Sequence, residues 1–207
     1  MKKALLFLML IIGGAFSGAH AQIGLGIKGG LNISDCAGEG CEDLSKSLAR
    51  LSFHVGIVGS TIINRRLSFQ AELLYSTQGV RLESFFLDGL LIDEAIFRND
   101  YITIPLAIKF YPISGLYLCA GTQLGYLIQS ELEIKSQGTS ISEDVRDDFS
   151  NLDIGLIGGL GYDFRNGFAL EARYVAGITS IFGSDGSVGR NTNIQISIGY
   201  RIIKNRN

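Results

Sequence analysis

The stretch Tyr101–Gln129, YITIPLAIKFYPISGLYLCAGTQLGYLIQ, is apolar, yet polar residues and two prolines interrupt it. Up to the PISG segment at 112–115, every second residue is apolar: Ile102, Ile104, Leu106, Ile108 and Phe110. After that segment the alternation resumes with Leu116, Leu118, Ala120, Thr122, Leu124, Tyr126 and Ile128. A period of two is typical of β-strands and not of helices. The stretch therefore predicts two strands joined by a turn, each with one apolar and one more polar face.

The same alternation recurs along the rest of the chain. It is found around residues 23–33, 52–57, 68–76, 152–163, 168–174 and 193–202. Together with the two strands of the opening stretch, this predicts eight strands. The fold class is therefore expected to be all-β.

The connections between the predicted strands fall into two length classes that alternate along the chain. The short ones are 63–66, 112–115 and 165–167, where Asn166-Gly167 is a strong hairpin signal. The long ones are about 34–50, 79–99, 130–149 and 178–191. Strict alternation places every tight turn at one end of the sheet. A sheet edge cannot stay unpaired in lipid, so we predict a closed eight-stranded antiparallel up-and-down transmembrane β-barrel.

The aromatic residues on the apolar face form two groups along the predicted strands. The group near the tight turns is Phe69, Phe110, Tyr162, Phe164, Phe168 and Tyr200. The group toward the long loops is Tyr75, Tyr126 and Tyr174. Two aromatic belts on a lipid-facing surface are typical of outer-membrane barrels.

The opposite face of the strands carries charges of both signs. The predicted polar network of the lumen is Lys28, Glu72, Lys109, Glu171, Arg173 and Arg201. Because eight strands leave an interior filled by side chains, these charges should pair with one another. Pro105 lies in the middle of a predicted strand and cannot donate to the ladder, so a local bulge or a missing bond is expected there.

The N-terminus indicates export. Lys2 and Lys3 precede the apolar stretch Ala4–Ile12, and Ala19-His20-Ala21 fits a cleavage site. We predict a signal peptide at residues 1–21 and an outer-membrane β-barrel domain at residues 22–207. Both termini would then be periplasmic and the long loops extracellular. Within the second loop, the apolar sequence FFLDGLLIDEAIF either extends the strands above the bilayer or contacts a partner.

An exported chain meets an oxidising compartment, so the cysteines are candidates for a disulfide. Cys36 and Cys41 flank AGEG and could close a small loop, although the spacing permits this bond without requiring it. Cys119 has no evident partner and is interpreted as a small packing residue.

Other motifs give no chemistry. GLGIKG at 24–29 matches G-x-G-x-x-G, but no helix is expected after it, and a nucleotide site needs one. His54 is expected on the polar face, whereas a lipid-modifying Ser–His pair should face the acyl chains. Without Lys2 and Lys3, 16 basic residues stand against 20 acidic ones, so nothing indicates nucleic acid. We expect no catalysis, no cofactor and no metal site.

Five segments carry a resemblance to a known family: YITIPLAIKFY, GLYLCAGTQLGYLI, DIGLIGGLGYDF, FALEARYVAGIT and NIQISIGYRI. They resemble the PorT-like outer-membrane β-barrels common in Bacteroidota, which are Gram-negative. The resemblance implies an eight-stranded barrel of the size of OmpX or the OmpA membrane domain, and for most members it implies no established activity. The C-terminal YRIIKNRN departs from the terminal aromatic residue of many outer-membrane barrels.

The function predicted from these observations is a small outer-membrane barrel with a structural or interaction role through its extracellular loops. The expected partners are the lipid bilayer, lipopolysaccharide and proteins that meet the loops, and the barrel is expected to be a monomer. Three alternatives stay open: an accessory component of a secretion or gliding apparatus, a lipid-modifying barrel enzyme that uses His54, and a soluble lipocalin-like ligand carrier with its faces reversed.

Overall fold

The computed structural model describes residues 23–38, 47–87, 90–136, 139–146, 149–180 and 189–203. The predicted signal peptide at 1–21, residue Cys41 and most of the predicted loop at 178–191 lie outside these ranges. In the described part of the chain, no helix is long and apolar enough to cross a membrane.

The described residues form nine strands. They are β1 (Ile23–Ala37), β2 (Ser47–Asn64), β3 (Leu67–Leu87), β4 (Leu90–Phe110), β5 (Leu116–Ser136), β6 (Thr139–Asp144), β7 (Leu152–Asp163), β8 (Phe168–Gly177) and β9 (Arg190–Ile203). All pairings are antiparallel. The prediction of an all-β fold is confirmed.

Eight of the strands close into a ring. The strand order is β4-β3-β2-β1-β9-β8-β7-β5-β6, and β4 also pairs with β5, so the sheet has no open edge around the barrel. First and last strands meet because β1 pairs with β9 along most of its length. The predicted closed eight-stranded up-and-down barrel is therefore confirmed, with β6 as an added strand that pairs only with β5.

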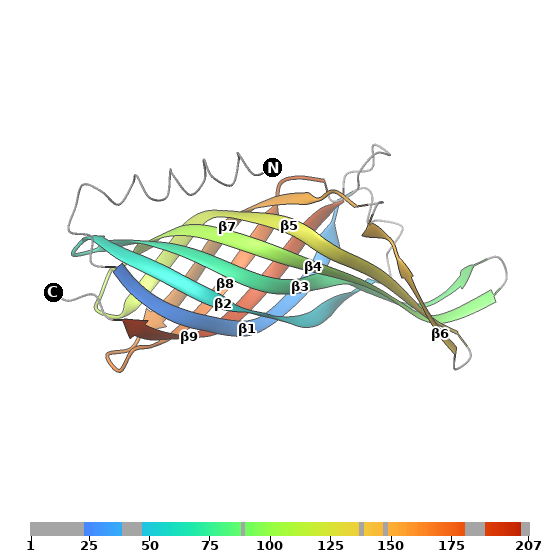
Figure 1. Cartoon of the computed structure of the whole chain (residues 1–207), viewed down its shortest axis with the longest axis horizontal. Helices are drawn as coiled ribbons and strands as arrows, with labels where there is room; N and C mark the ends of the chain where they lie inside the picture. The colour runs from blue at the N-terminus through green and yellow to red at the C-terminus, as the bar shows by residue number, and fades with distance from the viewer. Residues whose placement is uncertain are drawn as a thin grey trace.

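The three tight turns, the start of β1 and the end of β9 all lie at one end of the molecule (Figure 1). The turn after β4 and the turn after β7 each need a glycine in the left-handed region, Gly115 at φ 86° and Gly167 at φ 98°. At the turn after β2, Asn64 accepts hydrogen bonds from the backbone N–H groups of Arg66 and Leu67. The short connections therefore form as their sequences predict.

The faces of the barrel are inverted relative to a soluble protein. Apolar side chains such as Ile57, Leu160 and Ile198 are 54–59% exposed, whereas Glu72 and Arg173 are 3–4% exposed. A soluble carrier would bury the aliphatic residues and expose the charged ones. This inversion rules out the soluble-carrier alternative, because the outward face suits hydrocarbon and the inward face does not.

Glycines on the inner face keep the interior narrow. A Cβ atom at Gly30 would lie 2.1 Å from the carbonyl oxygen of Ile196 and 2.9 Å from Cε1 of His54. At Gly161 it would lie 2.4 Å from the ring of Tyr117. Side chains therefore fill the lumen up to the backbone of the surrounding strands.

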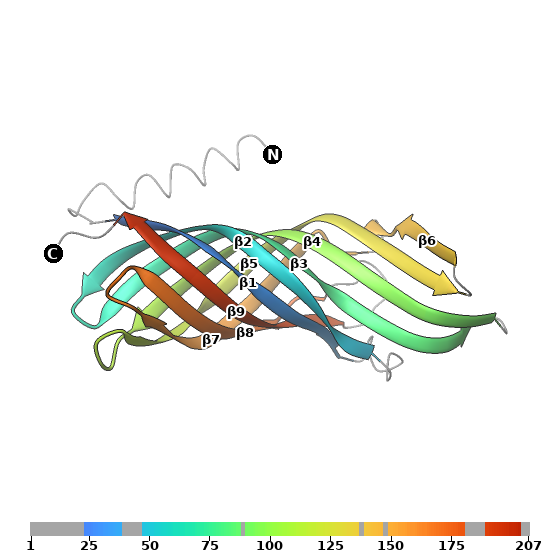
Figure 2. The ribbon, with the colours of Figure 1, turned by 90° about the horizontal axis from the view of Figure 1, so that it is seen from below.

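Two of the predicted long loops are wrong. Most of 79–99 belongs to β3 and β4, and much of 130–149 belongs to β5 and β6. These strands continue past the barrel as a sheet of four strands, which we call the blade: residues 79–87, 90–100, 129–136 and 139–144. Figure 2 shows the blade projecting from the end opposite the tight turns. The apolar segment at 85–97 thus extends the strands, as one of its two interpretations expected.

Irregular pairing explains why the blade was missed. On β5, Gln129 pairs with Asp100 and Leu127 pairs with Tyr101, so Ile128 is an extra residue that shifts the alternation. Both Ile128 and Gln129 are exposed. Beyond this bulge charged residues replace aliphatic ones on the outward face, so the alternation that predicts the other strands is lost.

Pro105 interrupts one ladder. On β3 and β4, the pairing stops after Ala71 with Leu106 and resumes at Leu74 with Thr103, without a change of register. On its other side Pro105 pairs with Gln123. The structure therefore shows the expected gap in the ladder and not a bulge.

Candidate functional site

The interior of the barrel contains a group of buried charges, which we call the central cluster: Lys28, Glu72, Lys109, Glu171 and Arg173. They come from β1, β3, β4 and β8, and each is at most 6% exposed. Burying a charge is unfavourable unless the charge is paired and hydrogen-bonded. Because the alternation points these five side chains into the lumen, they must contact one another.

Glu72 is the best satisfied member of the central cluster. Arg173 donates to both of its carboxylate oxygens, at 3.0 and 3.1 Å. Lys28 donates to Oε1 at 3.0 Å, and Gln70 donates to the same oxygen at 2.6 Å. Such a forked guanidinium–carboxylate pair fixes both side chains across the lumen.

Glu171 joins the two cationic sides of the cluster. Lys28 donates to its Oε1, and the hydroxyl of Tyr117 donates to its Oε2 at 2.9 Å. Lys109 lies 3.9 Å from Oε2, and its Nζ is 3.8 Å from the centre of the Tyr117 ring. Paired charges and an aromatic ring therefore fill the middle of the barrel.

A hydrogen-bonded layer centred on His54 lies next to the central cluster. Asn32 uses its amide hydrogens on Ser76 and on the carbonyl of Thr77, so its oxygen accepts from Nδ1 of His54 at 2.8 Å. Nε2 then accepts from the hydroxyl of Ser197, also at 2.8 Å. The histidine is thereby held as the Nδ1–H tautomer.

Ser197, His54 and Asn32 have the chemical types of a nucleophile, a base and an orienting amide. All three are at most 1% exposed, and none of them lines the cavity at the tight-turn end. Because the Ser197 hydroxyl is buried and already bonded to His54, the layer is best explained as packing of polar groups inside the barrel.

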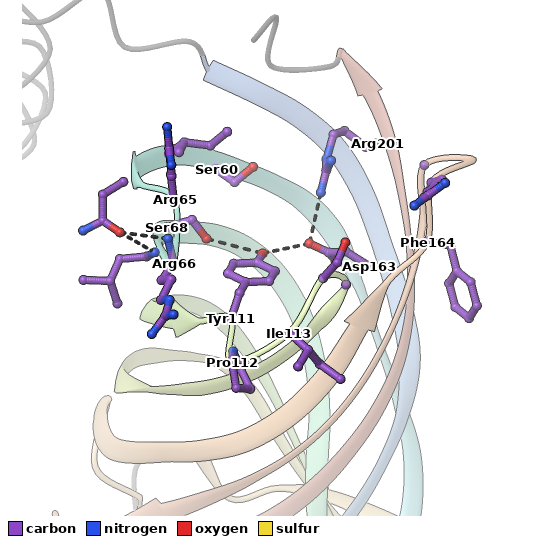
Figure 3. A pocket seen from close by; sticks show the side chains of 17 residues that line it. Ser60, Arg65, Arg66, Ser68, Tyr111, Pro112, Ile113, Asp163, Phe164 and Arg201 are labelled. Carbon is purple, nitrogen blue, oxygen red and sulfur yellow. Dashed lines mark hydrogen bonds and ion pairs between the residues drawn. The ribbon is translucent and has the colours of Figure 1, made fainter.

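The tight-turn end is hollow. A cavity of about 1030 Å³, which we call the mouth, is lined by all three tight turns and by the end of β9. Figure 3 shows Tyr111, Asp163 and Arg201 pointing toward one another there. Tyr111 donates to Oδ2 of Asp163 at 2.8 Å, and Arg201 donates to the same oxygen at 3.2 Å.

The six residues of the predicted lumen network separate into two places. Five of them form the central cluster, whereas Arg201 lies at the mouth on Asp163. Sequence reasoning did not single out Tyr117, Asp163 and Gln70 as partners. Alternation does put Tyr117 and Asp163 on the inner face, but which inner residues touch depends on the register between strands, which the sequence does not state.

All nine residues of the predicted aromatic belts have side chains that are exposed or partly exposed. Near the tight turns, Tyr162 packs on Phe164 with ring centres 4.8 Å apart, and Phe168 packs on Tyr200 at 4.9 Å. Tyr75 and Tyr126 both pair with Ile102 at the other side of the apolar band. The remaining members are Phe69, Phe110 and Tyr174.

Phe53 was missed as an aromatic neighbour of Tyr75, with ring centres 6.0 Å apart. The hydroxyl of Tyr75 donates to Asp100 at 2.7 Å, where the outward face becomes polar.

Beyond Tyr75, the outward face of the blade carries alternating charges. Glu94 on β4 contacts Arg81 on β3 and accepts a hydrogen bond from Lys135 on β5 at 2.9 Å. Arg98 lies 3.9 Å from Glu133 and 4.0 Å from Glu131. We call these six residues the charge ladder. Its half-exposed ion pairs contribute little to stability, but they exclude this face from hydrocarbon.

Neither the cysteines nor the potential metal ligands of the described residues form a reactive centre. Cys36 is disulfide-bonded, while its predicted partner Cys41 lies outside the described residues. Cys119 is a free, buried thiol. Across the described ranges, no group of three or more His, Cys, Asp or Glu side chains could hold a metal ion.

The closed ring, the outward apolar band and the charged interior define the chain as a small outer-membrane β-barrel. Its sequence matches the family of outer membrane protein beta-barrel domains over residues 17–183, and the chain belongs to this family. The protein therefore resides in the outer membrane, in contact with the bilayer. A search of curated protein sequences finds no match.

Solved structures with the same architecture include Neisserial surface protein A, with a TM-score of 0.50 and 13% identity over 86% of this chain and 97% of that one. The attachment invasion locus protein Ail of Yersinia pestis has a TM-score of 0.46 and 16% identity over 86% of this chain and 98% of that one. At these identities the likeness concerns the fold.

Proposed function

We propose that the protein is a non-catalytic, non-conducting outer-membrane barrel that presents the blade outside the cell, where it contacts neighbouring surface molecules. The barrel anchors the blade, and the central cluster closes the lumen. The blade's charged outward face would meet lipopolysaccharide, and its strands would meet proteins.

The length of the blade carries this proposal. Membrane-spanning strands need about 9–11 residues, and β7 and β8 have 12 and 10. In contrast, β3, β4 and β5 have 21 residues each. The surplus of about ten residues corresponds to roughly 30 Å of strand at about 3.3 Å per residue. Anchoring in a bilayer does not require this length, so another contact does.

The orientation and the export route belong to the same proposal. Residues 1–21 act as a signal peptide, residues 22–207 are the barrel domain, and both termini are periplasmic. Long loops outside and tight turns inside are the rule for outer-membrane barrels, which supports this orientation. On intact cells, Ser142→Cys should react with a membrane-impermeant maleimide and Ser114→Cys should not. Labelling of Ser114→Cys alone would reverse the orientation.

The functional test removes the blade but keeps the barrel. Arg81 and Ile96 are register partners, as are Glu131 and Asp144. Joining each pair by Asn-Gly, in place of residues 82–95 and 132–143, closes two hairpins. The shortened protein should still fold, as judged by a heat-dependent shift in gel mobility, but lose the surface cross-links that the full protein forms in intact cells. Unchanged cross-links in the folded variant would refute a role for the blade.

Absence of catalysis is supported by the buried, fully hydrogen-bonded His54 and by its distance from the lipid face. We expect His54→Ala to leave the lipid A of producing cells unchanged in mass spectra. A lost modification would revive the lipid-modifying alternative.

The PorT-like resemblance favours a second candidate role, as an accessory component of a secretion or gliding apparatus. The residues that carry it are the Ile-Pro within β4 and the EARY segment of β8. In mild detergent, a stable complex with other exported proteins would support this role, and a clean monomer would support the simpler proposal.

A further inference from the structure

The mouth has an unbalanced charge. Four guanidinium groups line it, those of Arg65, Arg66, Arg165 and Arg201, against the single carboxylate of Asp163. Among the residues that the structure describes, Arg201 is the one of these four with an ion pair. Asp163 also accepts from Tyr111 and lies 3.9 Å from Lys109, so its one negative charge already faces two cations and does not balance the other three arginines.

The three remaining arginines come from two turns that are far apart in the sequence but line the same cavity. Arg65 and Arg66 form the turn after β2, and Arg165 lies in the turn after β7. Within the described residues, their guanidinium groups make no ion pair or hydrogen bond. Figure 3 places Arg65 and Arg66 on the same side of the mouth as Ser68 and across from Arg201. All three arginines are exposed, so water screens part of their repulsion, and together they give the hollow a positive potential that attracts anions.

The same cavity also has apolar walls. Ile62, Ile113 and Phe164 line it and are 50%, 64% and 40% exposed. Phe164 packs on Tyr162 in the aromatic group near the tight turns, so these walls lie at the edge of the lipid-facing band. An inorganic anion needs no apolar walls. A lipid, in contrast, has a charged headgroup for the arginines and an apolar body for these walls.

We propose that the mouth binds the phosphate of a lipid headgroup, with Arg65, Arg66 and Arg165 as its ligands. Guanidinium groups match phosphate oxygens in forked hydrogen bonds, and they are less strongly hydrated than ammonium groups. The glycerol and upper acyl segments would rest on Ile113 and Phe164. With the orientation proposed above, this lipid is a phospholipid of the periplasmic leaflet.

The chain offers a direct reporter because it contains no tryptophan. Ile113→Trp places a single fluorophore at the mouth. The folded protein is reconstituted in bilayers of phosphatidylcholine with a minor fraction of brominated lipid, whose bromines quench tryptophan on contact. Both leaflets have the same composition, so the result does not depend on orientation. Quenching by brominated phosphatidylglycerol, relative to brominated phosphatidylcholine, gives the preference for the anionic headgroup.

We expect the reporter protein to prefer phosphatidylglycerol by about tenfold, which corresponds to one strong charge-assisted contact. Adding Arg65→Gln, Arg66→Gln and Arg165→Gln should remove the preference. The matched control, Arg81→Gln, Arg98→Gln and Lys135→Gln, loses the same charge at the opposite end and should keep it. Equal loss in both variants, or no preference in the reporter protein, would overturn the proposal.

Two further measurements are made. One separates recognition of phosphate from attraction to any negative charge, and the other separates a lipid from a soluble phosphate compound. Brominated oleate carries a carboxylate, and quenching as strong as that by phosphatidylglycerol would overturn phosphate recognition. Added glycerol phosphate should not reduce the preference if the acyl body is needed. A reduction would assign the same arginines to a soluble phosphate ester. Each variant is first checked for folding by its heat-dependent gel shift, and single substitutions of Arg165 replace the triple variant if that fails.

Discussion

Inside the barrel, Lys28 lies between Glu72 and Glu171 and donates to both. The charges of the central cluster are buried, so their contribution to stability depends on every charge keeping its partners. A buried ion pair adds little by itself compared with an apolar pair, but removing one partner leaves an uncompensated charge. Residue-scale effects should therefore be large in the cluster and small in the charge ladder.

Lys28→Met tests this difference. Two carboxylates would then share the remaining cations, and we expect the free energy of unfolding to fall by about 3 kcal/mol. Urea unfolding from lipid vesicles, followed by gel mobility, measures it. Lys135→Met, which removes an exposed member of the charge ladder, should leave the midpoint unchanged. Equal effects of both substitutions would mean that the cluster is not coupled.

At the scale of elements, the blade depends on exposed pairs and the barrel on buried ones. Glu94 joins three strands, because it contacts Arg81 on β3 and Lys135 on β5. The hydrogen bond from Lys135, helped by the charge of Arg81, lowers the pKa of Glu94. A lowered folded-state pKa stabilises the folded blade above the ordinary carboxyl range, and the effect is lost as pH falls through the folded value.

Acidification should therefore loosen the blade before the barrel. We expect the hydrogen-exchange protection of Ala95 and Ile134 to decrease as pH falls below about 4.5, the ordinary range of a glutamate, while that of Ile196 stays constant. In Glu94→Gln this decrease should be smaller. If the pH profile of the variant matches that of the original protein, Glu94 does not control the pairing.

For the molecule as a whole, inversion of the faces and a filled lumen go together. Eight strands enclose a space that side chains fill, and here the central cluster, Tyr117 and the His54 layer occupy it. The mouth lies at the tight-turn end, and neither Ser197 nor His54 lines it. We therefore expect the barrel not to conduct solutes.

Electrical recording tests this consequence. In planar bilayers the purified barrel should give no conductance steps above the baseline, because no continuous aqueous path crosses the central cluster. Vesicles that contain it should retain small solutes. Regular steps that scale with protein concentration would show that the cluster opens.

Much of this could be predicted from local pattern. Alternation assigned Ile102 and Leu124 to one face and Glu72 and Arg173 to the other, because a period of two can be recognised within each strand separately. The blade escaped prediction where that period breaks, at Ile128, and where charges replace aliphatic residues, as at Arg98. Partners such as Ser197 for His54 could not be found, because they lie 143 residues apart.

By itself, the sequence determined the strands of the barrel, the three tight turns and the direction of the barrel's side chains toward lipid or lumen, since these depend on neighbours along the chain. Only the tertiary structure decided which inward charges meet, that Arg201 stays at the mouth on Asp163, and that arginines of two distant turns surround one cavity. Those contacts follow from the register and closure of the barrel, which couple residues from strands far apart in the chain.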